Sequence, residues 1–123
     1  MNNLQTAVLE QLGFDSLDDD AKDTLSDISN HGVDGGFNGF IYYSDTVEFF
    51  DNNRNLVLSE LNQFADELGE SAIDIVKGFK CLNGDYDSEV EQVIMNLDDS
   101  DNTTVKNALA WFAAEHVAHQ LAQ

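Results

Sequence analysis

The chain has 123 residues, of which 24 are Asp or Glu and only five are Lys or Arg, so its formal net charge is −19. A surface with this charge repels nucleic acids and anionic membranes and attracts basic proteins. Hydrophobic residues still make up 42% of the chain, which excludes the class of disordered acidic tails. The length fits one domain, residues 1–123, with a single core.

Because the chain has no proline, its helix ends must be set by Gly, Asn, Asp and Ser. A first helix is expected to begin at a cap on Asn3 and to end at Gly13, with apolar residues at four-residue spacing. A second helix is expected to begin at Ser16 and to end at residues 30–32. The glycine-rich stretch 30–40 is predicted to be a loop.

A short extended segment is expected over residues 40–43, followed by a short helix through Phe50. A longer helix is predicted to begin at Asn55 and to end at Gly69, because apolar residues recur along one face between them. Ser71 is expected to begin another helix.

Two further helices are expected in the last third of the chain. Asp87 or Ser88 caps the first of them, which ends near Leu97. Asn102 or Thr103 opens the last one. The sequence therefore predicts an all-α fold, a compact bundle of about six or seven short helices.

The acidic residues fall into blocks with few basic neighbours. Two acids four residues apart on a helix repel each other at a cost of roughly 0.2–0.5 kcal/mol, which a Lys or Arg at one position would turn into a similar gain. Since the sequence forgoes that gain repeatedly, we expect the acids to bind a partner. The predicted partner-binding residues are Asp15, Asp18, Asp19, Asp20, Asp23, Asp27, Asp66, Glu67, Glu70, Asp85, Asp87, Glu89, Glu91, Asp98, Asp99 and Asp101.

The amount of charge also matches a nucleic acid of the same size. A compact chain of this length has a diameter of roughly 35 Å. Duplex DNA carries about 20 phosphates over that distance, close to the net charge of −19. This agreement favours a protein that mimics DNA, provided that its acids share one continuous face.

Other chemistry has weaker support in the sequence. Glu115, His116 and His119 are spaced to share a helix face and to contact a metal, and His31 is the only further imidazole. The spacing is not that of a metalloprotease, and histidines near a helix end commonly interact with its dipole. No nucleophile–base pair is recognisable, and Cys81 is expected to be an inert thiol. We therefore predict neither an enzyme, nor a bound metal, nor another cofactor.

Two loops allow alternative interpretations. Phe37 and Phe40 are expected to anchor the glycine-rich loop to the core, although such an aromatic loop also suits insertion into a partner's pocket. Residues 98–101 resemble the start of a calcium loop only loosely, because the closing Glu is missing. Helix capping by Asp101 or Asn102 accounts better for this second segment.

Residues 28–50, ISNHGVDGGFNGFIYYSDTVEFF, carry a resemblance to known proteins. The motif Asn30-His31-Gly32, Asp34, Gly39-Phe40 and Tyr42-Tyr43-Ser44-Asp45-Thr46 is similar to that of a family of small proteins from bacteriophages and mobile elements. This resemblance implies an origin rather than an activity. In size, charge and helical pattern, without a shared motif, the chain also resembles phage DNA-mimic antirestriction proteins and acidic anti-CRISPR proteins.

These observations together predict an inhibitor that blocks the DNA- or RNA-binding groove of a host defence protein, such as a CRISPR effector or a restriction enzyme. We expect it to act in the host cytoplasm, because no secretory signal or membrane-spanning run is recognisable. It is expected to bind neither nucleic acid nor membranes directly. One alternative is an immunity-like protein that neutralises a basic toxin, and another is a metal-binding protein that uses the C-terminal histidines. Trp111 suits the core or a homodimer contact equally.

Overall fold

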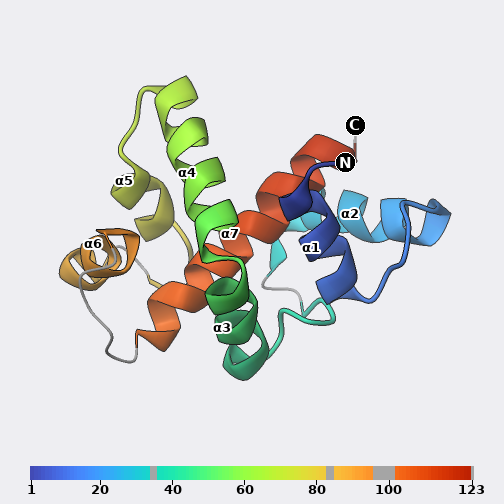
Figure 1. The fold of residues 1–123 in the computed structure, drawn as a ribbon, viewed down its shortest axis with the longest axis horizontal. Helices are drawn as coiled ribbons and strands as arrows, with labels where there is room; N and C mark the ends of the chain where they lie inside the picture. The colour runs from blue at the N-terminus through green and yellow to red at the C-terminus, as the bar shows by residue number, and fades with distance from the viewer. Residues whose placement is uncertain (34–35, 83–84, 96–101, 123) are drawn as a thin grey trace.

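The computed structural model describes residues 1–33, 36–82, 85–95 and 102–122, which form seven α-helices and no β-strand (Figure 1). The predicted all-α class and the predicted number of helices are confirmed. The helices are α1 (Asn3–Leu12), α2 (Asp19–His31), α3 (Tyr43–Asn52), α4 (Arg54–Leu68), α5 (Ala72–Lys77), α6 (Asp87–Met95) and α7 (Thr103–Leu121). Within the described ranges, no helix combines the length and the apolar character that crossing a membrane requires.

Helix α7 is the centre of the fold, and each of the other six helices packs against it. In Figure 1 it runs obliquely through the molecule, with α2 and α6 toward opposite ends of the long axis. Alanine makes this packing feasible, because a small side chain lets a neighbouring helix approach closely. Five of its buried residues are alanines, Ala108, Ala110, Ala113, Ala114 and Ala118. A helix with this many buried residues is a core helix, not an amphipathic surface one.

Side-chain capping sets where the first two helices begin. Asn2, not the expected Asn3, is the N-cap of α1: its side chain accepts a hydrogen bond from the Gln5 amide, and the Gln5 side chain accepts one from the Asn2 amide. This reciprocal pair is a capping box. Asp18 caps α2 by accepting a hydrogen bond from the Ala21 amide at 2.9 Å, so the start expected at Ser16 was too early.

The extended segment expected over residues 40–43 is absent, since Tyr43 already belongs to α3. Tyr42, the N-cap of α3, has an extended backbone, with φ −105° and ψ 142°, but no residue of the segment belongs to a strand. Phe40 is buried in the core, where its ring lies 5.5 Å from that of Phe49, and its carbonyl accepts a hydrogen bond from the Trp111 indole. The segment thus anchors a loop, as the alternative based on Phe40 predicted.

A buried polar contact joins α3 to α7. The Thr46 hydroxyl donates a hydrogen bond to Oδ1 of Asn107 at 2.7 Å, and both residues are fully buried. A buried polar group without a partner is costly, so this pair favours one register of α3 on α7 over others. This hydrogen bond therefore holds the first turn of α3 against α7.

We expect Gly39→Ala to destabilise the fold far more than Gly36→Ala. Both glycines have positive φ, +86° and +90°, so alanine is strained at either position by about 1 kcal/mol. A Cβ on Gly39 would lie 2.1 Å from the carbonyl oxygen of Gln11, whereas a Cβ on Gly36 would meet nothing within 4 Å. We expect the additional loss for Gly39→Ala to be about 2 kcal/mol or more. Urea unfolding followed by circular dichroism measures both losses, and equal losses would contradict this close approach.

Candidate functional site

The six predicted acids of the first block, Asp15 to Asp27, are all exposed on or just before α2. Three of them also stabilise the beginning of α2. Asp18 caps the helix, and Asp19 and Asp20 lie in its first turn, where the positive end of the helix dipole stabilises carboxylates. The block is therefore partly explained by helix formation, and Asp23 and Asp27 are the members of α2 free of such a role.

The second block lies where α4 ends and α5 begins, and the third lies at α6. Asp66, Glu67 and Glu70 are exposed. In the third block Asp85 precedes α6, so Asp85 and Glu89 are not a pair four residues apart on one helix. All the described acids of this block are exposed except Glu89, which is half-buried. Asp98, Asp99 and Asp101 lie outside the described residues.

Asp87 has a basic partner that its sequence neighbourhood did not reveal. Its carboxylate lies 2.7 Å from the ammonium group of Lys77 at the end of α5. This hydrogen bond, together with the attraction of Asp87, Asp74 and Asp85, raises the pKa of Lys77 above its ordinary value and keeps the ammonium group charged. The α6 block is thus partly neutralised from within the fold.

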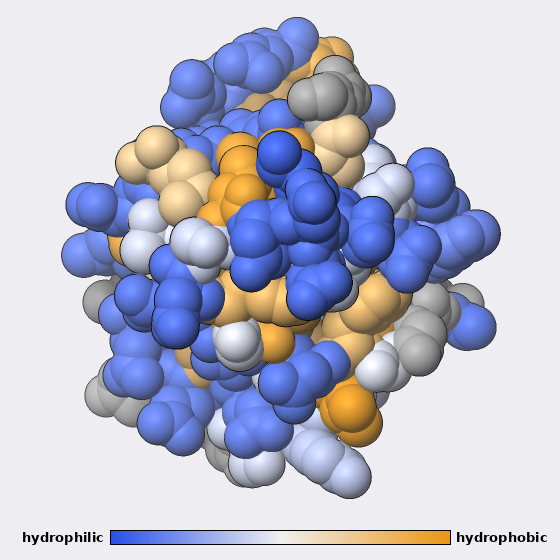
Figure 2. All heavy atoms as spheres, turned by 90° about the vertical axis from the view of Figure 1, so that its right-hand side faces the viewer, coloured by the Kyte–Doolittle hydropathy of each residue, from blue (hydrophilic) through white to orange (hydrophobic). Residues whose placement is uncertain are grey.

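Among the described residues, the acids of α2 and those of α6 do not lie side by side. In Figure 1, α2 and α6 lie toward opposite ends of the longest axis, with α7 passing between them. Figure 2 looks onto the end that carries α1 and α2, where hydrophilic residues cover most of the face and apolar residues show in a band between them. The negative charge is therefore distributed over separate surfaces.

Most basic side chains are engaged inside the fold. Lys106 on α7 lies 2.9 Å from the Asp51 carboxylate on α3. Arg54 donates a hydrogen bond to the carbonyl oxygen of Val93 and lies over the Phe50 ring, 5.2 Å from its centroid. These contacts join helices to one another, as does the pair formed by Lys77. Consequently little positive charge remains at the surface to offset the carboxylates.

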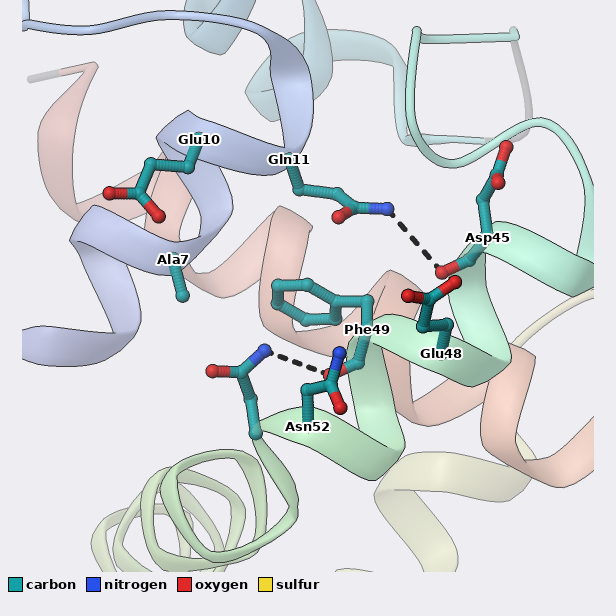
Figure 3. A pocket seen from close by; sticks show the side chains of 8 residues that line it. Ala7, Glu10, Gln11, Asp45, Glu48, Phe49 and Asn52 are labelled. Carbon is teal, nitrogen blue, oxygen red and sulfur yellow. Dashed lines mark hydrogen bonds between the residues drawn. The ribbon is translucent and has the colours of Figure 1, made fainter.

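A groove between α1 and α3 was not predicted from the sequence (Figure 3). It has a volume of about 340 Å³, and we call it the α1–α3 groove. The lining residues are Ala7, Glu10, Gln11, Asp45, Glu48, Phe49, Asn52 and Asn53. Glu10, Asp45 and Glu48 are exposed, whereas Phe49 is only 3% exposed. Gln11 reaches across the groove, where its side-chain amide donates to the backbone carbonyl of Asp45.

Helical spacing was the available signal for this groove. Ala7, Glu10 and Gln11 fall on one face of α1, and Asp45, Glu48 and Asn52 fall on one face of α3. The sequence does not state that these two faces oppose each other, because residues about 35 positions apart are brought together only by packing on α7.

Three large apolar side chains next to the groove are exposed, and we call Ile41, Tyr42 and Tyr43 the aromatic patch. Their exposed fractions are 49%, 66% and 42%. The patch adjoins the groove through Asp45, whose amide donates to the Tyr42 carbonyl at 3.1 Å. Contiguous exposed apolar side chains commonly mark interaction sites.

The C-terminal histidines face different neighbours. His116 lies 3.4 Å from the Glu60 carboxylate, and its ring packs against those of Phe64 and Phe112. His119 forms a 2.7 Å hydrogen bond with Ser29. Among the described residues, no group of three or more His, Cys, Asp or Glu side chains is arranged to hold a metal ion.

Glu115, the remaining member of the suggested metal site, accepts a hydrogen bond from the Val33 amide at 3.2 Å. It therefore connects α7 to the loop that follows α2. Together with the contacts of the two histidines, this bond packs α7 against its neighbours. The metal-binding alternative consequently gains no geometric support from the described part of the chain.

The family model described as Domain of unknown function (DUF7222) matches residues 1–123. The chain belongs to this family. Neither the curated proteins nor the solved structures contain a match. The description of this family assigns no activity, so the function must be argued from the surface of the chain itself.

We expect Cys81 of this DUF7222 protein to react slowly with iodoacetamide. Burial raises the pKa of its thiol, an effect that the Asn107 side chain and the amides of Cys81 and Leu82 offset only in part. A raised pKa leaves less thiolate at neutral pH, and thiolate is the nucleophile. The rate should therefore rise at a higher pH than it does for the unfolded protein. Coinciding pH profiles of the folded and unfolded states would show that the thiol is unperturbed.

Proposed function

We propose that this protein is a non-enzymatic inhibitor that occupies the basic DNA- or RNA-binding groove of a host defence protein, a CRISPR effector or a restriction enzyme, in the host cytoplasm. One observation carries the proposal. The net charge is −19, and three of the five basic side chains, Arg54, Lys77 and Lys106, are engaged within the fold. The surface therefore presents carboxylates that a basic groove can pair with.

Binding of this protein to such a groove would gain free energy in the same way as binding of nucleic acid does. A groove lined by Lys and Arg binds polyphosphate largely through charge and the release of counterions. Exposed carboxylates on a folded helical scaffold offer the same groove opposite charge, with less conformational entropy to lose than a flexible chain. Complementary charge also accelerates encounter.

The placement of the acids refines how such a groove would be occupied. Because α2 and α6 lie toward opposite ends of the long axis, we propose that their acid blocks engage separate parts of the groove. The acids of α2 and α6 thus do not share the single continuous face on which the sequence argument for DNA mimicry depended, and the proposal rests instead on the net charge and on two separate acid blocks. The phage resemblance of residues 28–50 agrees with a role against host defence.

The aromatic patch favours a second candidate, an immunity-like protein that neutralises one basic toxin. Tyrosine side chains contribute strongly to protein-specific binding, whereas charge alone is permissive toward many basic partners. An immunity-like protein would bind its cognate toxin but would not compete with DNA on unrelated nucleases. Competition with DNA therefore separates the two candidates.

The first proposal is tested by displacement of a fluorescent DNA duplex from a purified CRISPR effector–guide complex and from a purified restriction enzyme. We expect the protein to displace the duplex from at least one of them. Polyaspartate of the same net charge should be far less effective, because it must lose chain entropy on binding. Displacement from neither enzyme, or equal displacement by polyaspartate, would contradict the proposal.

Neutralising exposed acids should weaken that displacement. The triple variant Asp20→Asn, Asp23→Asn and Asp27→Asn leaves the cap at Asp18 intact. Since a rim charge contributes roughly 0.5 kcal/mol, the three changes should raise the inhibitory concentration about tenfold. The thermal midpoint serves as the control for folding, and an unchanged inhibitory concentration would remove α2 from the binding surface.

A further inference from the structure

We propose that the α1–α3 groove and the aromatic patch form the central contact surface for a basic protein partner. The groove receives an Arg or Lys side chain of that partner, and the patch packs on the apolar residues beside it. This inference rests on the proposed function in one respect, that the partner is a basic protein. It assigns the decisive contact to residues outside the acid blocks that the sequence indicated.

The chemistry of the groove fits a long cationic side chain. Carboxylates stand on two helices, Glu10 on α1 and both Asp45 and Glu48 on α3, and none of the lining residues is basic. Within the described part of the chain, neither Glu10 nor Glu48 forms an ion pair. Ala7, which is half-buried, gives the groove a small apolar surface for the methylene stem of Arg or Lys, while the carboxylates pair with its charged head.

The carboxylates are too dispersed for a metal ion, which favours an organic cation. The described chain has no group of three or more such ligands with metal-binding geometry. A guanidinium or ammonium group on a long side chain can instead reach carboxylates on both walls of a groove of about 340 Å³. The amides of Gln11, Asn52 and Asn53 offer further hydrogen-bond acceptors along the same groove.

The aromatic patch stands on a rigid base. The Tyr42 carbonyl accepts hydrogen bonds from the amides of Asp45 and Thr46 at 3.1 Å, which fixes the first turn of α3. Thr46 is in turn bonded to the buried Asn107 of α7. A patch held in this way loses little conformational entropy on binding, so its exposed apolar area is available for affinity.

Charge complementarity selects the occupant. A second copy of this chain would add a further net charge of −19, and its own groove carboxylates would repel those of the first copy. Nucleic acid and anionic membranes are repelled in the same way. A basic protein gains binding free energy at both parts of the surface, through ion pairs in the groove and through apolar contacts with the aromatic patch.

The position of the surface matches the usual anatomy of an interface. In Figure 1, α3 lies at the lower edge of the molecule, about midway along the long axis, with α2 and α6 toward the two ends of that axis. Interfaces commonly have aromatic anchors and well-packed pockets at their centre and a charged, hydrated rim. The acid blocks therefore guide encounter, and the central surface determines how long the complex lasts.

The first test is an NMR titration of the isotope-labelled protein with a short amidated peptide of alternating leucine and arginine, at about 0.15 M salt to screen diffuse attraction. The same peptide with citrulline in place of arginine is the control, because citrulline keeps the shape and removes the charge. We expect amide shifts to be concentrated in residues 7–11 and 41–53 and to be nearly absent with the citrulline peptide. Shifts concentrated on α2 and α6, or equal binding of the two peptides, would overturn the proposal.

Matched variants separate the groove from general charge. Glu10→Gln with Glu48→Gln should weaken peptide binding about tenfold. Asp20→Asn with Asp23→Asn changes the net charge equally but should alter binding less than about twofold. All four side chains are exposed, so the variants are expected to fold. Equal weakening by both pairs would mean that the groove is not a site.

A second pair of variants tests the patch. Tyr42→Ala with Tyr43→Ala should weaken binding about tenfold, in the range of interface hot spots. Leu68→Ala with Met95→Ala removes similarly exposed apolar side chains elsewhere and should have no effect. If both pairs weaken binding equally, the patch has no specific role and the proposal fails.

The duplex displacement assay separates this proposal from the proposed function. If the peptide binds at the groove but the protein displaces DNA from neither nuclease, the proposed contact surface is supported and the proposed inhibitor function is refuted. If the protein displaces DNA and the double variant Glu10→Gln with Glu48→Gln displaces it equally well, the proposed contact surface is refuted and the proposed inhibitor function is supported.

Discussion

The packing of six helices around the alanine-rich α7 is the constraint on which the rest of the structure depends. Small side chains on every side of α7 let its neighbours approach closely, and the buried bond between Thr46 and Asn107 favours one placement of α3 against it. The position of α3 in turn forms the groove with α1 and presents Tyr42 and Tyr43 outward. A charge-rich surface is thus built on a core that contains few polar groups.

The charge distribution follows from how the few cations are used. Lys77 and Lys106 each pair with one exposed carboxylate, Asp87 and Asp51, and Arg54 donates to a backbone carbonyl, so these three cations neutralise only two surface acids. Carboxylates left at the surface repel one another, a cost to stability that a buried apolar core of this size can tolerate. Such a surface is useful where a basic partner must be reached quickly and held against a competing polyanion.

Local features of the fold were predictable from the sequence, whereas long-range ones were not. The helix ends at Gly13 and Gly69 and the cap at Ser71 were predicted because each depends on backbone or side-chain chemistry within a few residues. The pairing of Lys77 with Asp87 and the opposition of α1 and α3 depend on tertiary packing, which helical spacing does not specify. For the same reason the sequence indicated where acids are frequent, but not that α2 and α6 lie toward opposite ends of the long axis or that a groove lies between α1 and α3.

The dependence of binding on salt tests the central claim most directly. We propose that carboxylates on a folded surface take the place of phosphates in a basic groove. The logarithm of the association constant with a purified CRISPR effector or restriction enzyme should therefore fall linearly with the logarithm of salt concentration, with a slope of several units. An association constant that hardly changes with salt, or no binding even at low salt, would contradict it.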